Sequence, residues 1–214
     1  MSNKKLYFVL RHGERGDRHA TTREFPVNFD PTLTEKGLIQ AQQSAQKIYS
    51  LIPSGKTVHL VSSPTLRCIE TAAAIASLFN IPIHIEEGFG ALVAGLGNSP
   101  FDGLTHNLWG IEEVEKFCGA KIIMNNHLAR PTFPEPDEIY KRRIQYVWDT
   151  YTEILQEDVL IIVSHMIVVQ SLTSILLNTD FLVSEEGYCR LTIAEETDEG
   201  VNVLQTADYS HATQ

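Results

Sequence analysis

The feature that most constrains the fold is a series of short apolar runs that each stop abruptly at a polar residue. Val159–Val163 is the clearest of them, and Leu6–Leu10 is another. Short runs without alternation are typical of strands buried on both faces of a parallel sheet. Neighbouring parallel strands need a long crossover connection, which is usually a helix. The pattern therefore predicts strands and helices in alternation.

Helical spacing is found between these runs. Apolar residues three or four positions apart predict helices over residues 34–51, from Pro64 onward and over residues 166–178. Ser63 is the expected N-cap of the second helix, and Pro64 suits its first turn. The remaining β segments are predicted at Thr57–Val61, Ile81–Ile85, Tyr188–Ala194 and Val201–Thr206, the last two as a closing hairpin.

A further helix is expected to start at Pro136, with Arg142 and Arg143 on its surface. Its apolar side is expected to carry Ile139, Val147, Tyr151 and Ile154. The segment over about residues 86–134 is rich in Gly and Pro and shows only a short helical pattern near Leu108–Phe117. A long irregular segment in a compact domain is often a functional lid, and that is the expectation here.

Together these elements predict an α/β fold, a doubly wound and mostly parallel sheet flanked by helices. The chain shows no repeat and no linker, so one domain over residues 1–214 is expected. With 17 Lys and Arg against 27 Asp and Glu, the net charge is −10. That balance argues against nucleic acid or an anionic membrane as the partner, since both need a broad basic surface.

The lengths of the apolar runs and the spacing of the cysteines indicate the compartment and argue against a zinc site. The apolar runs are far shorter than the roughly 18 to 20 residues of a membrane span, and Leu6–Leu10 is too short for a signal-peptide core. Three cysteines without C-x-x-C spacing suggest neither a disulfide framework nor a zinc site. A cytoplasmic protein is the expectation, and the oligomeric state is left open.

Ligands of open α/β sheets bind beyond the carboxyl ends of the strands. In this sequence three such ends carry basic side chains: Arg11 and His12 after the first strand, Arg67 in the segment after the second, and His165 after Val159–Val163. The other histidines are scattered and are expected at the surface or in packing: His19, His59, His84, His106, His127 and His211.

These four residue types suit a phosphate monoester. Arginine binds phosphoryl oxygens in pairs, and a helix N-terminus adds amide donors. A neutral imidazole can attack phosphorus, while a second histidine helps to hold the transferring group. Considered alone, His165 is better explained as a structural residue than as a catalytic one. Considered alone, Arg67 is better explained as a solvated charge or a member of an ion pair. Taken together, the four favour phosphate chemistry.

Four motifs then occur in the order found in one family: Leu10-Arg11-His12-Gly13-Glu14; Asp30-Pro31-Thr32-Leu33-Thr34-Glu35-Lys36-Gly37 with Gln40-Ala41; Ser62-Ser63-Pro64-Thr65-Leu66-Arg67-Cys68 with Thr71-Ala72; and Val163-Ser164-His165. Over about residues 5–206 the chain resembles the histidine phosphatase superfamily, which has the phosphoglycerate-mutase-like fold. The resemblance implies that His12 is the nucleophile and forms a phosphohistidine, which water then hydrolyses without a metal or other cofactor.

The segment from Arg11 to Asp17 resembles the R-H-G-E-R-x-D version of the motif. That version is found in the phosphatase domains of ubiquitin-associated, SH3-containing proteins, the suppressors of T-cell-receptor signalling. By this resemblance Arg15 joins Arg11, Arg67 and His165 in binding phosphate.

Two departures from the family pattern affect the expected chemistry. Met166 follows His165, where many members have a smaller residue, and its side chain could narrow the pocket. The general acid of the sub-branch would fall near Ala91 or Leu92, which cannot donate a proton. Glu87 is the best candidate to replace it; the alternatives are Glu86, Asp102 or no acid at all, with Glu86 and Glu87 then a solvated strand end.

Without a well-placed acid, a phenolate leaves more easily than an alkoxide, because phenols have a pKa near 10. The leading hypothesis is therefore a metal-independent phosphomonoesterase that favours aryl or protein phosphates. Its substrate would be a phosphorylated small molecule or a phosphoprotein. The alternatives are a phosphoglycerate-type mutase, which residues 86–134 match poorly, and a phosphate- or phosphoprotein-binding module without turnover.

Overall fold

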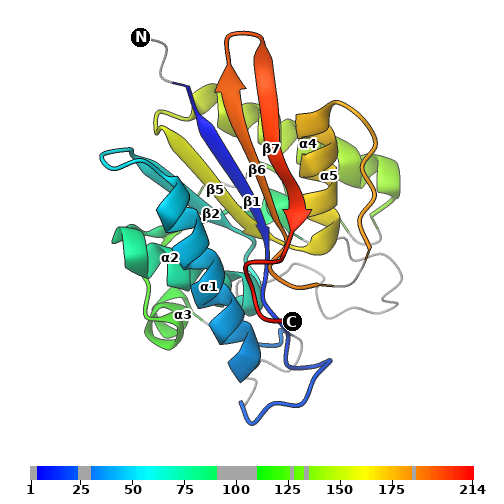
Figure 1. Cartoon of the computed structure of the whole chain (residues 1–214). Helices are drawn as coiled ribbons and strands as arrows, with labels where there is room; N and C mark the ends of the chain where they lie inside the picture. Colours follow the sequence, from blue (N-terminus) through cyan, green and yellow to red (C-terminus); the bar gives the residue numbers. More distant parts are fainter. Residues whose placement is uncertain (1–3, 24–29, 91–109, 126–127, 133–134, 185–186) are drawn as a thin grey trace.

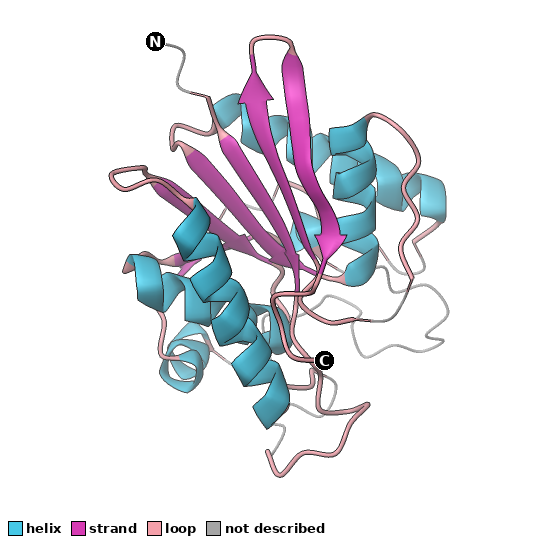
Figure 2. Ribbon diagram, viewed as in Figure 1, coloured by secondary structure: helices cyan, strands magenta, loops and turns pink. Residues whose placement is uncertain are grey.

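The computed structural model describes residues 4–23, 30–90, 110–125, 128–132, 135–184 and 187–214. These residues form a seven-stranded sheet of order β4-β3-β2-β5-β1-β6-β7. Its first five strands are parallel, and the last two pair antiparallel at one edge (Figures 1 and 2). The strands are β1 (Leu6–Arg11), β2 (Val58–Ser62), β3 (Ile83–Ile85), β4 (Ile122–Met124), β5 (Val159–Ser164), β6 (Leu191–Thr197) and β7 (Gly200–Asp208).

Helices cover both faces of this sheet. The helices α1 (Glu35–Leu51), α2 (Leu66–Phe79) and α3 (Ile111–Cys118) contribute to the core on one face, and α4 (Asp137–Ile154) and α5 (Met166–Leu177) to the core on the other. The short 3₁₀ helix η1 (Glu87–Phe89) follows β3. The expected doubly wound, mostly parallel α/β fold is confirmed.

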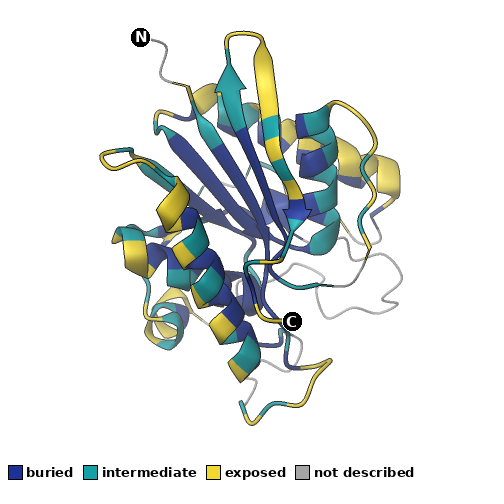
Figure 3. Cartoon of the chain, viewed as in Figure 1, coloured by how far each residue is buried: buried dark blue, intermediate teal, exposed yellow. Residues whose placement is uncertain are grey.

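The continuous apolar runs are explained by burial on both faces. In β1, Phe8 and Leu10 pack into the core with α1 and α2, whereas Tyr7 and Val9 pack into the core with α4 and α5. Successive side chains of a strand point to opposite faces, so both faces must be apolar. Figure 3 shows the central strands as the most buried part of the chain.

Most predicted elements are found within a few residues of their expected bounds. Thr34, expected as the first residue of α1, is its N-cap, since its Oγ1 accepts a hydrogen bond of 2.9 Å from the Gly37 amide. The third strand is shorter than predicted, and β4 was not predicted at all. That strand lies in the segment expected to be irregular, and three residues are too few to show a period. No helix in the described part of the chain has both the length and the apolar character needed to cross a membrane.

Three expectations about helix residues are wrong. Ser63 is not the N-cap of α2; Thr65 is, and Ser63 instead contacts His165. On α4, Ile139 and Ile154 are 44% and 56% exposed, because the buried stripe runs through neighbouring positions, Tyr140, Ile144, Val147 and Tyr151. Arg143, expected on the surface, is buried. Its guanidinium forms a two-pronged ion pair with the buried Glu135, at 2.6 and 2.7 Å.

The three predicted strand ends meet at one place because β2, β5 and β1 are neighbours in the sheet. Arg11 is the register partner of Ser164, and Ser62 is the partner of Val163. The residues that follow these positions therefore share the carboxyl edge of the sheet.

Candidate active site

His12 leaves β1 at the centre of this edge. Its amide donates a 2.9 Å hydrogen bond to the carbonyl of Ser164, and its side chain is buried. The ring Nδ1 lies 2.7 Å from the carbonyl oxygen of Gly13. A carbonyl only accepts, so Nδ1 carries the proton and Nε2 has the lone pair. Burial, aided by Arg67 and His165, holds the pKa of His12 well below its usual value, so the ring is neutral at pH 7.

The loop that carries His12 packs directly on two helices. The Gly13 amide donates to Thr71 Oγ1 on α2, and the Glu14 amide donates to Gln40 Oε1 on α1. A Cβ atom on Gly13 would lie 2.6 Å from the carbonyl oxygen of Gly37, which leaves no room for a side chain. This packing gives a physical reason for the glycine, glutamine and threonine positions of the sequence motifs.

His165 and Arg67 form the second half of the site. The Arg67 Nη2 lies 3.3 Å from His165 Nδ1 and can only donate, so Nδ1 accepts. His165 Nε2 therefore carries the proton and donates to Ser63 Oγ at 2.9 Å. Its ring centroid is 5.4 Å from that of His12. Burial, together with the positive charges of Arg67 and Arg15, lowers the pKa of His165 well below its usual value.

A carboxylate occupies the start of α2. Asp30 accepts a 2.8 Å hydrogen bond from the Leu66 amide and pairs with Arg67 Nη1 at 3.3 Å. The expectation that this helix N-terminus is open to phosphate is therefore wrong for the Leu66 amide. Burial raises the pKa of Asp30 in spite of the charge on Arg67. The Nε of Arg67 is buried and has no hydrogen-bond partner within the described residues.

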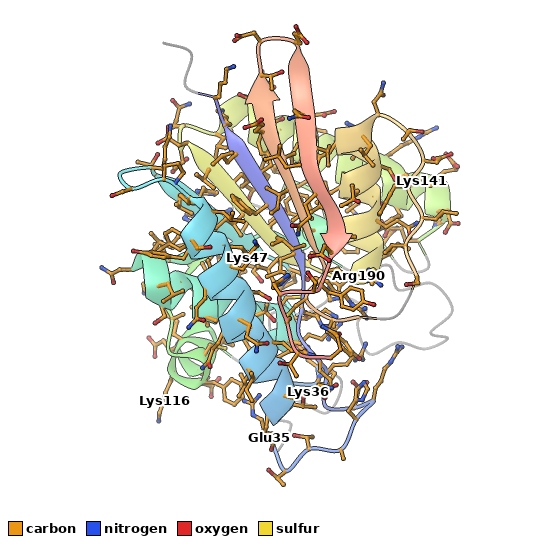
Figure 4. All side chains as sticks on the ribbon, in the orientation of Figure 1. Glu35, Lys36, Lys47, Lys116, Lys141 and Arg190 are labelled. Carbon is orange, nitrogen blue, oxygen red and sulfur yellow. The ribbon has the colours of Figure 1, made fainter. Side chains whose placement is uncertain are left out.

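Arg11 is held beside His12 by the segment before β6. Its Nη1 donates to the Gly187 carbonyl at 2.7 Å, and its guanidinium lies 4.5 Å from the ring centroid of Tyr188. Burial lowers the pKa of Arg11 to about 10, with smaller effects from Tyr188 (raising) and Arg190 (lowering), so the side chain remains charged at pH 7. Arg190, labelled in Figure 4, donates to the Ala207 carbonyl at 2.9 Å.

Arg15 lies close enough to affect the pKa values of His165 and Arg67. Its own guanidinium makes two hydrogen bonds to Asp17, at 2.5 and 2.6 Å. These two bonds come from Nε and Nη2. The expected contact of Arg15 with phosphate stays a prediction. Met166 begins α5 directly after His165, and its effect on the pocket also stays a prediction.

Glu86 and Glu87 are both buried, so the alternative of a solvated strand end is wrong. Glu86 caps η1, since its Oε1 accepts from the Gly88 amide at 2.7 Å. Glu87 is 2% exposed and forms a 2.9 Å ion pair with Arg130. Burial raises the pKa of Glu87, while Arg130 lowers it. The assignment of Glu87 as general acid stays a prediction; Ala91, Leu92 and Asp102 lie outside the described residues.

The 3₁₀ helix that bears Glu87 is tied to the site from two sides. Ser164, immediately before His165, donates a 2.6 Å hydrogen bond to the Phe89 carbonyl. Arg143 donates to the Gly88 carbonyl and holds Glu135 with its other nitrogens. No pattern in the sequence indicated this buried ion pair, because two charged residues on and before a helix are usually solvated.

The structure thus brings Arg11, His12, Arg67 and His165 together, as predicted, and adds residues that the prediction missed. Ser63 orients His165, Asp30 pairs with Arg67, and Tyr188 lies beside Arg11 and His12. Within the described residues, no group of three or more His, Cys, Asp or Glu is arranged to hold a metal ion. The arrangement provides a neutral nucleophilic imidazole next to two buried guanidinium groups.

Comparison with known proteins places the chain in a family. A segment of 88 residues is 32% identical to the transcription factor tau 55 kDa subunit of Saccharomyces cerevisiae, covering 39% of this chain and 20% of the yeast protein. A phosphoglycerate mutase from Bacillus anthracis has the same fold, with a TM-score of 0.66 and 20% identity over 98% of this chain and 96% of the mutase.

A phosphoserine phosphatase from Entamoeba histolytica also shares the fold, with a TM-score of 0.62 and 19% identity over 97% of this chain and 98% of that one. The family model described as the histidine phosphatase superfamily (branch 1) matches residues 7–208, nearly the whole chain. The sheet order, the paired histidines and this match agree: the chain belongs to the histidine phosphatase superfamily.

Proposed function

We propose that this protein is a metal-independent phosphomonoesterase that acts through a phosphohistidine on His12. The observation that carries the proposal is the state of His12, whose buried neutral ring has its lone pair on Nε2, close to His165 and Arg67. A nucleophile of this kind needs no base to activate it, since the attacking nitrogen is already deprotonated.

In the proposed reaction, Arg11 and Arg67 bind the phosphoryl oxygens and neutralise their charge. Arg15 joins them, as the R-H-G-E-R resemblance implies. His165 stays neutral and donates a hydrogen bond to a phosphoryl oxygen from Nε2, in exchange for its contact with Ser63. The Nε2 of His12 forms a bond to phosphorus as the bond to the ester oxygen breaks. Water then attacks the phosphohistidine, the P–N bond breaks, and inorganic phosphate and neutral His12 are released.

Glu87 is the proposed proton donor to the leaving oxygen. Its burial and raised pKa favour the protonated form, whereas its ion pair with Arg130 favours the carboxylate. A donor held back in this way assists alkoxide leaving groups poorly, so we propose that aryl or protein phosphates are the better substrates. Equal or faster turnover of glycerol or sugar phosphates would contradict this preference.

The Glu87–Arg130 ion pair also supports a second candidate function, a phosphate- or phosphoprotein-binding module without turnover. Such a module would use the same arginines. It would bind phosphate and hydrolyse no ester.

The test is the hydrolysis of 4-nitrophenyl phosphate from pH 5 to 8 in the presence of EDTA. We expect turnover in the wild type, none in His12→Ala, and an acid-labile, base-stable phosphoenzyme in rapid-quench samples. Arg67→Lys should be severely impaired, while the matched change Arg142→Lys on the exposed side of α4 should have no effect. Full activity of His12→Ala would overturn the proposal. An inactive wild type whose Tm still rises with phosphate would favour the binding module.

A further inference from the structure

Tyr188 lies against both groups that would handle the phosphoryl group. Its ring centroid is 6.0 Å from that of His12, at an interplanar angle of 46°, and 4.5 Å from the Arg11 guanidinium carbon. The side chain is partly exposed rather than buried in the core. An ester whose phosphoryl group is bound by Arg11 and attacked by His12 therefore has this ring within reach of its organic part.

The backbone around Tyr188 is held in an unusual conformation. Gly187 has a φ of +80°, and Cys189, which has a side chain, has a φ of +53°. A non-glycine residue in this region is strained and persists only where its surroundings require it. A Cβ atom on Gly187 would lie 2.8 Å from the Tyr209 ring, and the Cys189 amide donates to the His12 carbonyl at 3.3 Å. The turn therefore ties Tyr188 to the nucleophile's own backbone.

A second ring extends this surface away from the pocket. His19 packs edge-on against Tyr188 with centroids 5.6 Å apart, and its Nε2 lies 3.1 Å from the Tyr188 hydroxyl. The His19 side chain is 42% exposed, so the two rings lead from the buried His12 toward solvent. The Lys36 ammonium and the His19 ring both lie near the Glu14 carboxylate, at 3.5 and 3.7 Å.

We propose that Tyr188, extended by His19, is the specificity-determining wall that receives the planar leaving group of an aryl phosphate ester. The inference rests on the proposed function and names the residue that selects the substrate class. A planar ring gains from an offset or edge-on contact with Tyr188 in a way that an alkyl chain of equal polarity does not. The selection is separate from leaving-group acidity, since it depends on contact with the ring.

The test compares kcat/KM for 4-nitrophenyl phosphate and for glycerol 2-phosphate in the wild type, Tyr188→Phe and Tyr188→Leu. Tyr188→Leu should lower the aryl-to-alkyl ratio by about 3- to 10-fold, the usual worth of an aromatic pair. Tyr188→Phe keeps the ring and loses only the hydroxyl group that contacts His19 Nε2, so its ratio should stay within about twofold of the wild type. A phosphotyrosyl peptide is assayed beside the small aryl ester. The comparison shows whether the aryl group of the preferred substrate belongs to a protein or to a small molecule.

Binding of inorganic phosphate, measured by calorimetry, provides the control for damage to Arg11. If Tyr188→Leu lowers kcat/KM for both substrates by the same factor, the aryl-to-alkyl ratio is unchanged. Tyr188 then only supports Arg11, and the inference is overturned. A wild type that turns over neither substrate overturns the proposed function instead. The two failures are therefore distinguishable.

Discussion

His12 and His165 are both buried with pKa values held well below 6.5, and this makes the folded state sensitive to acid. Above pH 6.5 both rings are neutral in the folded and the unfolded chain, so they do not make the free energy of unfolding depend on pH. As the pH falls below 6.5, the unfolded chain takes up a proton at each site and the folded chain does not. The free energy of unfolding therefore decreases as the pH falls.

The size of the effect follows from the width of the pH interval. Each pH unit below 6.5 is worth about 1.4 kcal/mol per histidine, so one ring that stays neutral lowers the free energy of unfolding by about 2 kcal/mol between pH 7 and pH 5. For a chain of 214 residues this corresponds to a Tm decrease of about 4–8 °C.

The variant His12→Asn isolates this contribution, since its side-chain amide can still donate to the Gly13 carbonyl and does not titrate. Urea unfolding at pH 7 and pH 5 should show that the wild type loses about 2 kcal/mol more than the variant over this interval. Other titrating groups are shared by the two proteins and cancel. If the free energy of unfolding falls by the same amount between pH 7 and pH 5 in the wild type and the variant, the argument that His12 is neutral because it is buried is refuted.

Three further outcomes are expected. Ser63→Ala removes the acceptor for His165 Nε2 and should lower the free energy of unfolding by about 1–3 kcal/mol, measured by urea unfolding at pH 7; an unchanged value would show that this hydrogen bond is not maintained. Asp30→Asn removes the carboxylate that competes with phosphate for Arg67, so calorimetry should show inorganic phosphate binding about fivefold more tightly; weaker binding would contradict the competition. Glu87→Gln should lower kcat for glycerol 2-phosphate by about 100-fold, the low end of the range for a general acid, and kcat for 4-nitrophenyl phosphate far less. Equal values with the wild type on both esters would exclude Glu87 as the acid.

The parts of the fold that could be predicted are those encoded in local patterns. The run Val159–Val163 is apolar because both faces of β5 are covered, and that pattern indicated a buried strand. The grouping of Arg11, His12, Arg67 and His165 followed from one topological rule about strand ends. Neither inference required knowledge of any particular contact.

The parts that could not be predicted depend on pairs that are distant in the sequence. Asp30 reaches the start of α2 across 36 positions, and Ser63 contacts a histidine 102 positions away. Ser63 precedes a helix and has the right chemistry for an N-cap, yet its hydroxyl is used by His165 because that ring is buried beside it. Tyr188 gave no signal because its partners, Arg11, His12 and His19, lie near the other end of the chain.

The register between β1 and β5 has a consequence for how this site can change. Arg11 pairs with Ser164, so His12 and His165 are the next residues on two adjacent hydrogen-bonded strands. Such strands lie about 4.8 Å apart in any sheet, and the 5.4 Å between the two rings is close to that spacing. The register thus brings the two imidazoles to neighbouring positions, whereas contacts with Ser63 and Arg67 set how the His165 ring is turned. Substitutions at these two positions can therefore change the orientation of the ring while the backbone positions of both histidines stay the same.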